Sequence, residues 1–261
     1  MAPNKRVITD DELKAATRLS PDGAAHIYKI DEKTVLKFGD TVRRAEAETM
    51  QLVRRRTSAP VPSIHNVYEN KDGQTMIVMD YVPGKNLEDV WDTMSDESKA
   101  RIIAQLSQHL KEIRSITGAF IGGVDGTPCE DQIFEGKGSE SGPYKSEDEF
   151  NAGLVKSLKA SEEGAWVDIV SDLITKHLQG HEIVLTHNDF TPRNIIVQND
   201  CVTGILDWEL SGFFPAYWEY IKALYRPDWQ SGWIQERIID KILRPYLMEL
   251  AIMMHTRDIT W

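Results

Sequence analysis

The sequence predicts an α+β protein of two lobes, a small strand-rich lobe followed by a larger, mainly helical one. Apolar and polar residues alternate with a period of two through much of the first 79 residues. After the boundary Pro83-Gly84, apolar residues recur at helical spacing instead. A chain of 261 residues is long enough to bury the cores of two such lobes. We therefore expect an N-terminal lobe at 1–79, a hinge at 80–84 and a C-terminal lobe at 85–261.

The N-terminal lobe is predicted to contain four strands and one helix. The turn residues Asp31-Glu32-Lys33 separate the first two strands, and Asn70-Lys71-Asp72-Gly73 separate the last two. Thr41 is a candidate N-cap for the helix, and Pro60-Val61-Pro62 stops the helical pattern. In chain order, the expected elements are strands 26–30 and 34–38, a helix at 42–56, and strands 64–68 and 75–79.

The C-terminal lobe begins with a strong helical repeat. Its apolar positions are Ile102, Ile103, Leu106, Leu110 and Ile113. A glycine-rich stretch at 118–142 is predicted to be a loop. Further helices are expected at 147–159, at 166–178 and at 233–254, the last with a kink near its proline.

Composition narrows the class of protein. The net charge of −11 disfavours a nucleic-acid ligand, and no apolar run approaches the roughly 18 residues needed to cross a membrane. The N-terminal residues lack the apolar core of a signal peptide. Two cysteines, Cys129 and Cys201, are too few for a disulfide framework or a thiolate metal site. We expect a cytoplasmic protein; the oligomeric state is left open.

A predicted hairpin brings two oxygen-bearing side chains together. The apolar runs 195–197 and 204–206 flank the turn residues Asn199-Asp200. With a four-residue loop Asn194 pairs with Asp207, and a two-residue loop shifts the pairing by only two positions. In either register both residues lie at the open end of the hairpin. An amide oxygen and a carboxylate there suit Mg²⁺, which prefers oxygen ligands and keeps several waters.

Asp189 precedes this pair in a segment that reads HNDFTPRN. It precedes Asn194 by five residues, and Pro192 keeps the intervening loop open, so Asp189 can project beside a metal without binding it. Two metal ligands and a third group that receives a hydroxyl proton match phosphoryl transfer. Arg193 adds a positive charge of undefined role. The alternative reading is a capped turn with an Asx turn at Asp207.

Lys37 supplies the cation that a nucleotide would need. It lies inside the apolar run Val35-Leu36-Lys37-Phe38, where a lysine is unusual unless it is at an edge or is paired. The following helix carries Glu46 and Glu48 on nearly opposite faces. A strand–helix Lys–Glu pair would direct the ammonium toward phosphates. The alternative is a solvated lysine on an edge strand.

Five segments, in order and spacing, resemble the aminoglycoside phosphotransferase family of kinase-like phosphotransferase enzymes. They are VLKF, AEAETM, IVMDYVPG, HNDFTPRN and GILDWE. The Pro60-Val61-Pro62 segment and PAYWEY are similar to those of its filamentous-fungal members. The match runs from about Leu19 to Arg226 and implies a bilobal protein-kinase-like fold.

The resemblance also implies roles for individual residues, with ATP and Mg²⁺ as cofactors. Lys37 would contact the nucleotide phosphates and Glu48 would pair with it. Asp189 would be the catalytic base. The remaining implied roles are metal binding for Asn194 and Asp207, adenine binding by the Asp80 carbonyl and the Val82 amide, and support of the catalytic loop by His187 and Glu219.

Departures from the family pattern limit these expectations. The phosphate loop, 20–25, has one glycine and no Gly-x-Gly-x-x-Gly, so its backbone amides, helped by Ser20, would have to cover the phosphates. Asn188 and Phe190 replace the usual glycine and leucine of the catalytic loop. No activation segment fits between Asp207 and Tyr217, which weighs against a protein kinase.

The expected activity is therefore ATP- and Mg²⁺-dependent transfer of the γ-phosphoryl group to a hydroxyl of a small molecule. The acceptor could be an amino sugar, an amino alcohol or another metabolite. Eleven acidic and four basic residues at 130–172 would favour a cationic acceptor, although solvated helix faces and an acidic loop are the preferred explanation of these charges. The alternatives are a catalytically weak or inactive nucleotide-binding pseudokinase and an atypical protein kinase.

Overall fold

A computed structural model describes residues 6–20, 23, 25–134, 141–225 and 228–260. Its elements are α1 (Asp10–Ala15), β1 (Thr17–Arg18), β2 (Ala25–Lys29), β3 (Thr34–Gly39), α2 (Arg44–Arg56), β4 (Ile64–Glu69), β5 (Thr75–Asp80), β6 (Lys85–Asn86), α3 (Leu87–Val90), η1 (Trp91–Thr93), α4 (Asp96–Ile113), η2 (Gln132–Phe134), α5 (Glu147–Ser161), α6 (Ala165–His177), β7 (Ile183–Thr186), η3 (Pro192–Asn194), β8 (Ile195–Gln198), β9 (Cys201–Ile205), β10 (Gly212–Pro215), α7 (Trp218–Ala223), α8 (Gly232–Gln235), α9 (Ile238–Ile242) and α10 (Leu247–Thr260).

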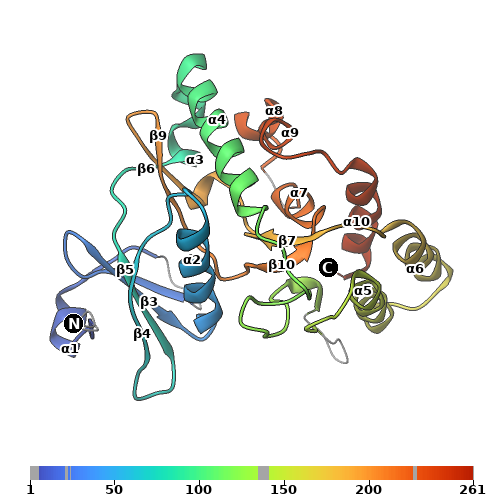
Figure 1. Cartoon of the computed structure of the whole chain (residues 1–261), viewed down its shortest axis with the longest axis horizontal. Coiled ribbons are helices and arrows are strands. Elements are labelled where there is room, and N and C mark those ends of the chain that lie inside the picture. Colours follow the sequence, from blue (N-terminus) through green and yellow to red (C-terminus); the bar gives the residue numbers. More distant parts are fainter. Residues whose placement is uncertain (1–5, 21–22, 24, 135–140, 226–227, 261) are drawn as a thin grey trace.

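The N-terminal part of the chain forms one antiparallel sheet with the strand order β1-β2-β3-β5-β4. Helix α2 lies alongside this sheet and contacts β4 and β5 (Figure 1). All four predicted strands and the helix are present. The helix begins at Arg44 rather than at 42, and Arg43 is its N-cap without a side-chain hydrogen bond. The expectation that Thr41 caps α2 was therefore wrong.

The chain leaves the five-stranded sheet at Asp80 and joins a second sheet at β6, which pairs with β8. Gly84 lies in this crossing with φ +147°, and a Cβ there would sit 2.6 Å from Ile196 Cγ2. Only glycine fits such a backbone and such a close approach. Because sheet partners change here, we propose the division into lobes at 80–84.

The C-terminal part is mainly helical, and Figure 1 shows α5, α6 and α10 on the side of β7 and β10 away from the N-terminal sheet, whereas α3 and α4 lie near β6 and β9. Helices α4, α5 and α6 match three of the predicted segments. The prediction of a single kinked helix at 233–254 was wrong, because the chain forms three helices there, α8, α9 and α10. Arg237 has φ +52° between α8 and α9, and Pro245 lies between α9 and α10.

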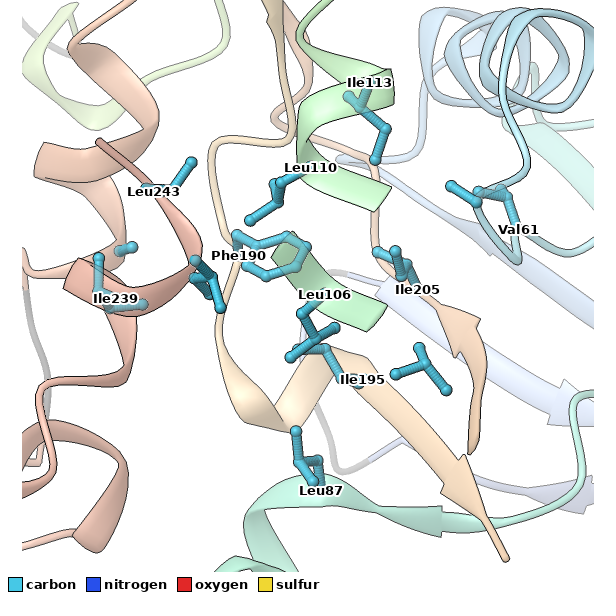
Figure 2. Packing of buried hydrophobic residues seen from close by; sticks show 14 of the residues in the cluster. Val61, Leu87, Leu106, Leu110, Ile113, Phe190, Ile195, Ile205, Ile239 and Leu243 are labelled. Atoms are coloured by element: carbon cyan, nitrogen blue, oxygen red, sulfur yellow. The ribbon is translucent and has the colours of Figure 1, made fainter. Parts of the chain in front are cut away.

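The largest core lies beneath the predicted hairpin. Figure 2 shows Leu106 and Leu110 of α4 packed with Phe190, Ile195 and Ile205. Phe190 follows Asp189 directly and is 1% exposed. The core therefore fixes both the loop that carries Asp189 and the strands that carry its neighbours. These features confirm an α+β protein with a strand-rich N-terminal part and a helical C-terminal part.

None of the helices formed by the described residues is both long and apolar enough to cross a membrane.

Candidate active site

The hairpin β8–β9 places Asn194 and Asp207 at its open end. Ile195 pairs with Ile205, and the Leu206 amide donates to the Asn194 carbonyl at 2.8 Å. Of the two registers considered, the two-residue turn is formed: Asn199 and Asp200 both have positive φ, at 51° and 59°. An irregularity after Ile196 shifts the register by one residue. The backbone of Asn194 thus lies opposite Leu206, the residue before Asp207.

Asp189 is held in place by two neighbours from its own loop. Asn194 Nδ2 donates to the backbone carbonyl of Asp189 at 2.9 Å and to its Oδ2 at 2.8 Å. Arg193 donates to both carboxylate oxygens of Asp189, at 2.9 and 2.8 Å. The short η3 turn at Pro192 supplies the bend that brings residues 193 and 194 back to Asp189. Asp189 therefore has a fixed orientation before any ligand binds.

The backbone before Asp189 is tied down by buried hydrogen bonds. Glu219 of α7 accepts from the amides of His187 and Asn188, at 2.6 and 3.1 Å. The imidazole of His187 donates through Nε2 to the Leu206 carbonyl at 2.9 Å, since a carbonyl can only accept. Its Nδ1 accepts from the Asp189 amide at 3.3 Å. Both residues therefore brace the loop without reaching the space in front of Asp189.

Asn188 has a backbone conformation that favours glycine. Its φ is +72°, in the left-handed region that asparagine tolerates better than most residues. Its side chain donates to the Leu210 carbonyl at 3.0 Å and accepts from Trp218 Nε1 at 3.0 Å. Asn188 thus ties the loop that carries Asp189 to the segment after Asp207.

The predicted partner of Lys37 requires a correction. Lys37 Nζ lies 2.9 Å from Glu46 Oε1, and Glu46, not Glu48, forms the strand–helix pair. Glu46 lies on the same stripe of α2 as the buried Met50 and Val53, at helical spacings of four and seven residues. Glu48 lies about 200° further around the helix and is partly exposed, so it points away from β3.

Lys37 also reaches across to the C-terminal lobe. Its ammonium lies 2.7 Å from Asp207 Oδ1 and 3.2 Å from Glu209 Oε2. The side chain is 3% exposed and comes from the central strand of the sheet, so the edge-strand alternative fails. Lys37 thus connects the N-terminal sheet to the residues after β9. We call Lys37, Glu46, Asp207 and Glu209 the lysine cluster.

In the lysine cluster, the single ammonium of Lys37 contacts three carboxylates. Burial by itself would lower the pKa of Lys37, but the charges of Glu46, Asp207 and Glu209 outweigh it and raise that pKa. Burial raises the pKa of Glu46 to about 7; Lys37 opposes the rise, and the nearby Asp207 and Glu209 add to it. The cluster therefore carries an excess of negative charge, a setting that favours an additional cation.

The donor atoms near the hairpin fit a magnesium ion. Nδ2 of Asn194 donates to Asp189. No hydrogen bond among the described residues uses Oδ1 of Asn194 or Oδ2 of Asp207. These are the oxygen ligands that Mg²⁺ prefers. The described residues contain no group of three or more His, Cys, Asp or Glu side chains arranged to hold a metal. A pair of protein ligands leaves room for phosphate oxygens and waters.

The predicted nucleotide contacts outside the cluster are only partly described. Pro21, Asp22 and Ala24 of the phosphate loop lie outside the described residues. The Ser20 hydroxyl accepts from the Ile27 amide at 3.0 Å, which ties the start of the loop to β2. At the hinge, the Asp80 carboxylate binds the Ser63 amide and His65, whereas no hydrogen bond of the Val82 amide occurs among the described residues.

A pocket of about 480 Å³ opens beside Asp189. Asp189, Asp207, Glu209 and Arg193 form one part of its wall, and Trp91 and Trp233 form another. Three further acids line it: Glu88, Asp92 and Asp228. Besides Arg193, the lining contains one other lysine or arginine among the described residues, Lys222, and its ammonium lies 2.9 Å from Asp131. The pocket therefore joins the predicted reacting groups to a strongly acidic, partly aromatic surface.

Several of these residues were not found from the sequence. Glu209 follows Asp207 by two residues in GILDWE, and that spacing could have identified it. Glu88, Asp92 and Asp228 come from separate loops and short helices, with no motif to connect them. Of the described residues at 130–172, Gln132 alone lines the pocket. The described acids of that stretch therefore do not form the acidic wall.

The fold resembles those of solved aminoglycoside phosphotransferases. An apo thermostable mutant of aminoglycoside phosphotransferase APH(4)-Ia aligns with a TM-score of 0.67 and 16% identity, over 95% of this chain and 88% of that chain. The GDP and kanamycin complex of APH(2")-IIia gives 0.64 and 13%, over 94% and 84%. The streptomycin-ATP-APH(2")-IIa ternary complex gives 0.59 and 15%, over 97% and 86%. At these identities the likeness establishes the fold.

No curated protein gives a significant match to the whole sequence. The phosphotransferase enzyme family matches residues 17–250, which include both predicted lobes and every element of the site described above. The bilobal fold and the segments that carry Lys37, Asp189, Asn194 and Asp207 all fall within that match. The chain belongs to the phosphotransferase enzyme family and is a small-molecule phosphotransferase.

Proposed function

We propose that the protein transfers the γ-phosphoryl group of ATP, in a Mg²⁺-dependent reaction, to a hydroxyl of a small cationic molecule. The observation that carries the proposal is the 480 Å³ pocket lined by Asp189 and Asp207, with Asn194 hydrogen-bonded to Asp189 and Lys37 bound to Asp207. These are a candidate base, two oxygen ligands and a phosphate-binding cation, which phosphoryl transfer requires.

Each group has a defined task. Lys37, oriented by Glu46, binds nucleotide phosphates, and the Asp80 carbonyl with the Val82 amide holds adenine. Ser20 orders the start of the phosphate loop. Asn194 and Asp207 hold Mg²⁺, which supplies charge neutralisation on the phosphates. Asp189 receives the proton of the acceptor hydroxyl, and Asn194 keeps that carboxylate oriented toward the pocket.

The pocket favours a cationic acceptor such as an amino sugar or an amino alcohol. Its lining holds six carboxylates, Glu88, Asp92, Asp189, Asp207, Glu209 and Asp228, against Arg193 and Lys222. Excess negative charge in a confined space attracts ammonium groups and rejects anions. Structures of similar fold were solved with hygromycin B, kanamycin and streptomycin. The chemistry of the pocket is compatible with acceptors of that charge.

Features of the chain argue against the two alternatives. A pseudokinase would lack one of the reacting groups, yet Lys37, Asp189, Asn194 and Asp207 are all present and gathered. A protein kinase needs a peptide platform after the metal-binding aspartate. Here β10 begins at Gly212, only five residues after Asp207, and pairs at once with β7. No room is left for that platform.

A screen for ADP release with MgATP across a library of hydroxyl-bearing metabolites tests the proposal. Each amino alcohol should be paired with its neutral analogue, and a panel of proteins should be run alongside. We expect turnover with one or more amine-bearing alcohols and none with proteins. Nucleotide-dependent thermal stabilisation without turnover on any acceptor would instead identify a pseudokinase, and transfer to protein would identify a protein kinase.

The state of the cysteines bears on the cellular location that we propose. Both cysteines are free, Cys129 buried and Cys201 exposed. Free thiols are typical of a reducing compartment. We therefore assign the protein to the cytoplasm.

A further inference from the structure

Arg193 binds Asp189 in an unusual manner. A single terminal nitrogen of the guanidinium, Nη2, donates to both carboxylate oxygens, at 2.9 and 2.8 Å. A fork-like pair would use two nitrogens for two oxygens. In the observed end-on contact, the Nε and Nη1 donors of Arg193 make no hydrogen bond to a described residue. The arginine therefore keeps donors available for a second anion.

The position of Arg193 is fixed at its backbone and open at its tip. Its carbonyl accepts a hydrogen bond from Asn86 Nδ2, and it lies in the η3 turn between Pro192 and Asn194. The side chain is 59% exposed and lines the pocket, whereas Asp189 is 19% exposed. An ion pair as exposed as this one contributes little to folding. Its location beside the proposed base points to a functional role.

Charge also singles out Arg193. The other basic residue of the pocket lining, Lys222, is 12% exposed and is held by Asp131. Lys37 is enclosed by three carboxylates. During phosphoryl transfer, negative charge spreads over the three equatorial oxygens of the moving group. Arg193 is the described cation that has both an exposed guanidinium and direct contact with the group expected to activate the acceptor.

We propose that Arg193 is a catalytic residue that bridges Asp189 and the phosphoryl group in transit. This inference rests on the proposed function. As the acceptor oxygen bonds to the γ-phosphorus, the bond to the β–γ bridging oxygen breaks, and ADP leaves with its electron pair. The acceptor proton passes to Asp189. The Nε and Nη1 donors of Arg193 bind phosphoryl oxygens, while Nη2 holds the carboxylate aligned with the incoming hydroxyl.

A mimic of the moving phosphoryl group tests this role without knowledge of the acceptor. Melting temperatures are measured with MgADP alone and with MgADP plus aluminium fluoride, which occupies the γ-position as a planar or near-planar anion. The variants are Arg193→Ala, Arg193→Lys and Arg193→Gln. Arg101→Ala is the matched control, because Arg101 pairs with Asp200 at 2.6 Å on the exposed turn of the same hairpin.

We expect MgADP to stabilise the wild type and all variants equally. Aluminium fluoride should add a further increase in the wild type and Arg101→Ala, a partial one in Arg193→Lys, and none in Arg193→Ala or Arg193→Gln. A full increase in Arg193→Ala, or its loss in Arg101→Ala, overturns the inference. If MgADP fails to stabilise the wild type, nucleotide binding itself is refuted, and the inference falls with the proposed function.

Kinetics with the acceptor found by the screen give a second readout. We expect Arg193→Ala to lower kcat roughly 10²–10³-fold, as for loss of one preorganised donor to transition-state charge. The KM for ATP should stay within about twofold, since the contact forms during transfer. Added guanidinium ion should restore part of kcat to Arg193→Ala but not to Asp189→Ala. An unchanged or increased kcat in Arg193→Ala would contradict the proposal, the increase showing that Arg193 only blocks the base.

Discussion

From the charges of the lysine cluster we predict how the substitution Glu46→Gln changes the free energy of unfolding with pH. Glu46 is 2% exposed and its carboxyl shares one ammonium with two other acids. Burial raises its pKa from the ordinary 4.5 to about 7, and the other two acids add to the rise. Because the folded pKa lies above the unfolded one, the folded protein holds this proton more tightly. The resulting stability is fully present below about pH 4.5 and is lost as the pH rises through about 7.

The size of the effect follows from the same values. The difference of about 2.5 pH units, at roughly 1.4 kcal/mol each, corresponds to roughly 3–4 kcal/mol at most. Glutamine has the shape of the protonated acid and cannot ionise. The Glu46→Gln variant should therefore match the wild type near pH 4.5 and exceed its free energy of unfolding by up to roughly 3–4 kcal/mol at pH 8.

Urea unfolding at pH 4.5, 6 and 8 measures this difference, because the contributions of other titrating groups cancel between variant and wild type. Glu48→Gln is the matched control, since it removes the same charge from the same helix outside the cluster. We expect it to stay within about 0.5 kcal/mol of the wild type at each pH. A Glu46→Gln variant that is 2 kcal/mol less stable than the wild type at pH 8 would refute the reasoning.

The same substitution should be costly for function. Glu46 is the group that holds Lys37 toward the C-terminal lobe, so Glu46→Gln should lower kcat/KM for ATP while Glu48→Gln leaves it unchanged. Stability gained at the expense of activity is a common property of functional sites, where like charges are kept close for a task. A Glu48→Gln variant that lost more activity than Glu46→Gln would show that the pairing is misassigned.

Three further predictions follow from the site. The double variant Asp92→Asn/Asp228→Asn should raise the KM of an amine-bearing acceptor about tenfold, on the order of 1.4 kcal/mol, without changing the KM of a neutral analogue. Steady-state kinetics measure both KM values, and equal effects on the two acceptors would remove the case for charge selection. Phe190→Ala should lower the free energy of unfolding by roughly 3–5 kcal/mol in urea, because it empties the core beneath the catalytic loop, and a loss below 1 kcal/mol would contradict that packing. Chelation of Mg²⁺ with EDTA should abolish transfer without changing the melting temperature of the free protein, and persistent transfer would exclude the assigned role of Asn194 and Asp207.

Short-range patterns allowed much of the site to be predicted. The turn residues Asn199 and Asp200 both adopt the left-handed backbone of a tight hairpin, and residue counting predicted the strand pairing closely: Asn194 pairs with Leu206, the residue before Asp207. The buried lysine in a strand predicted a carboxylate partner. These inferences succeeded because the hairpin and the strand are governed by neighbours in the sequence.

Predictions that depended on tertiary packing were less successful. Glu46 and Glu48 follow Lys37 by similar distances along the chain, and the face of α2 that packs on the sheet distinguishes them. The acids at positions 88, 92 and 228 meet because separate short helices pack around Trp91 and Trp233, whose rings lie 5.1 Å apart. The broken helix after residue 232 depends on the positive φ of Arg237, for which the sequence offered no glycine signal.

The most direct test of the account is the rate of phosphoryl transfer from MgATP to the identified acceptor by Asp189→Ala, measured together with nucleotide affinity. We predict that transfer falls by about 10²–10⁴-fold while the Kd for MgATP changes less than about twofold. Asp189→Ala with wild-type transfer to that acceptor would contradict the assignment of Asp189 as the base and, with it, the proposed active site.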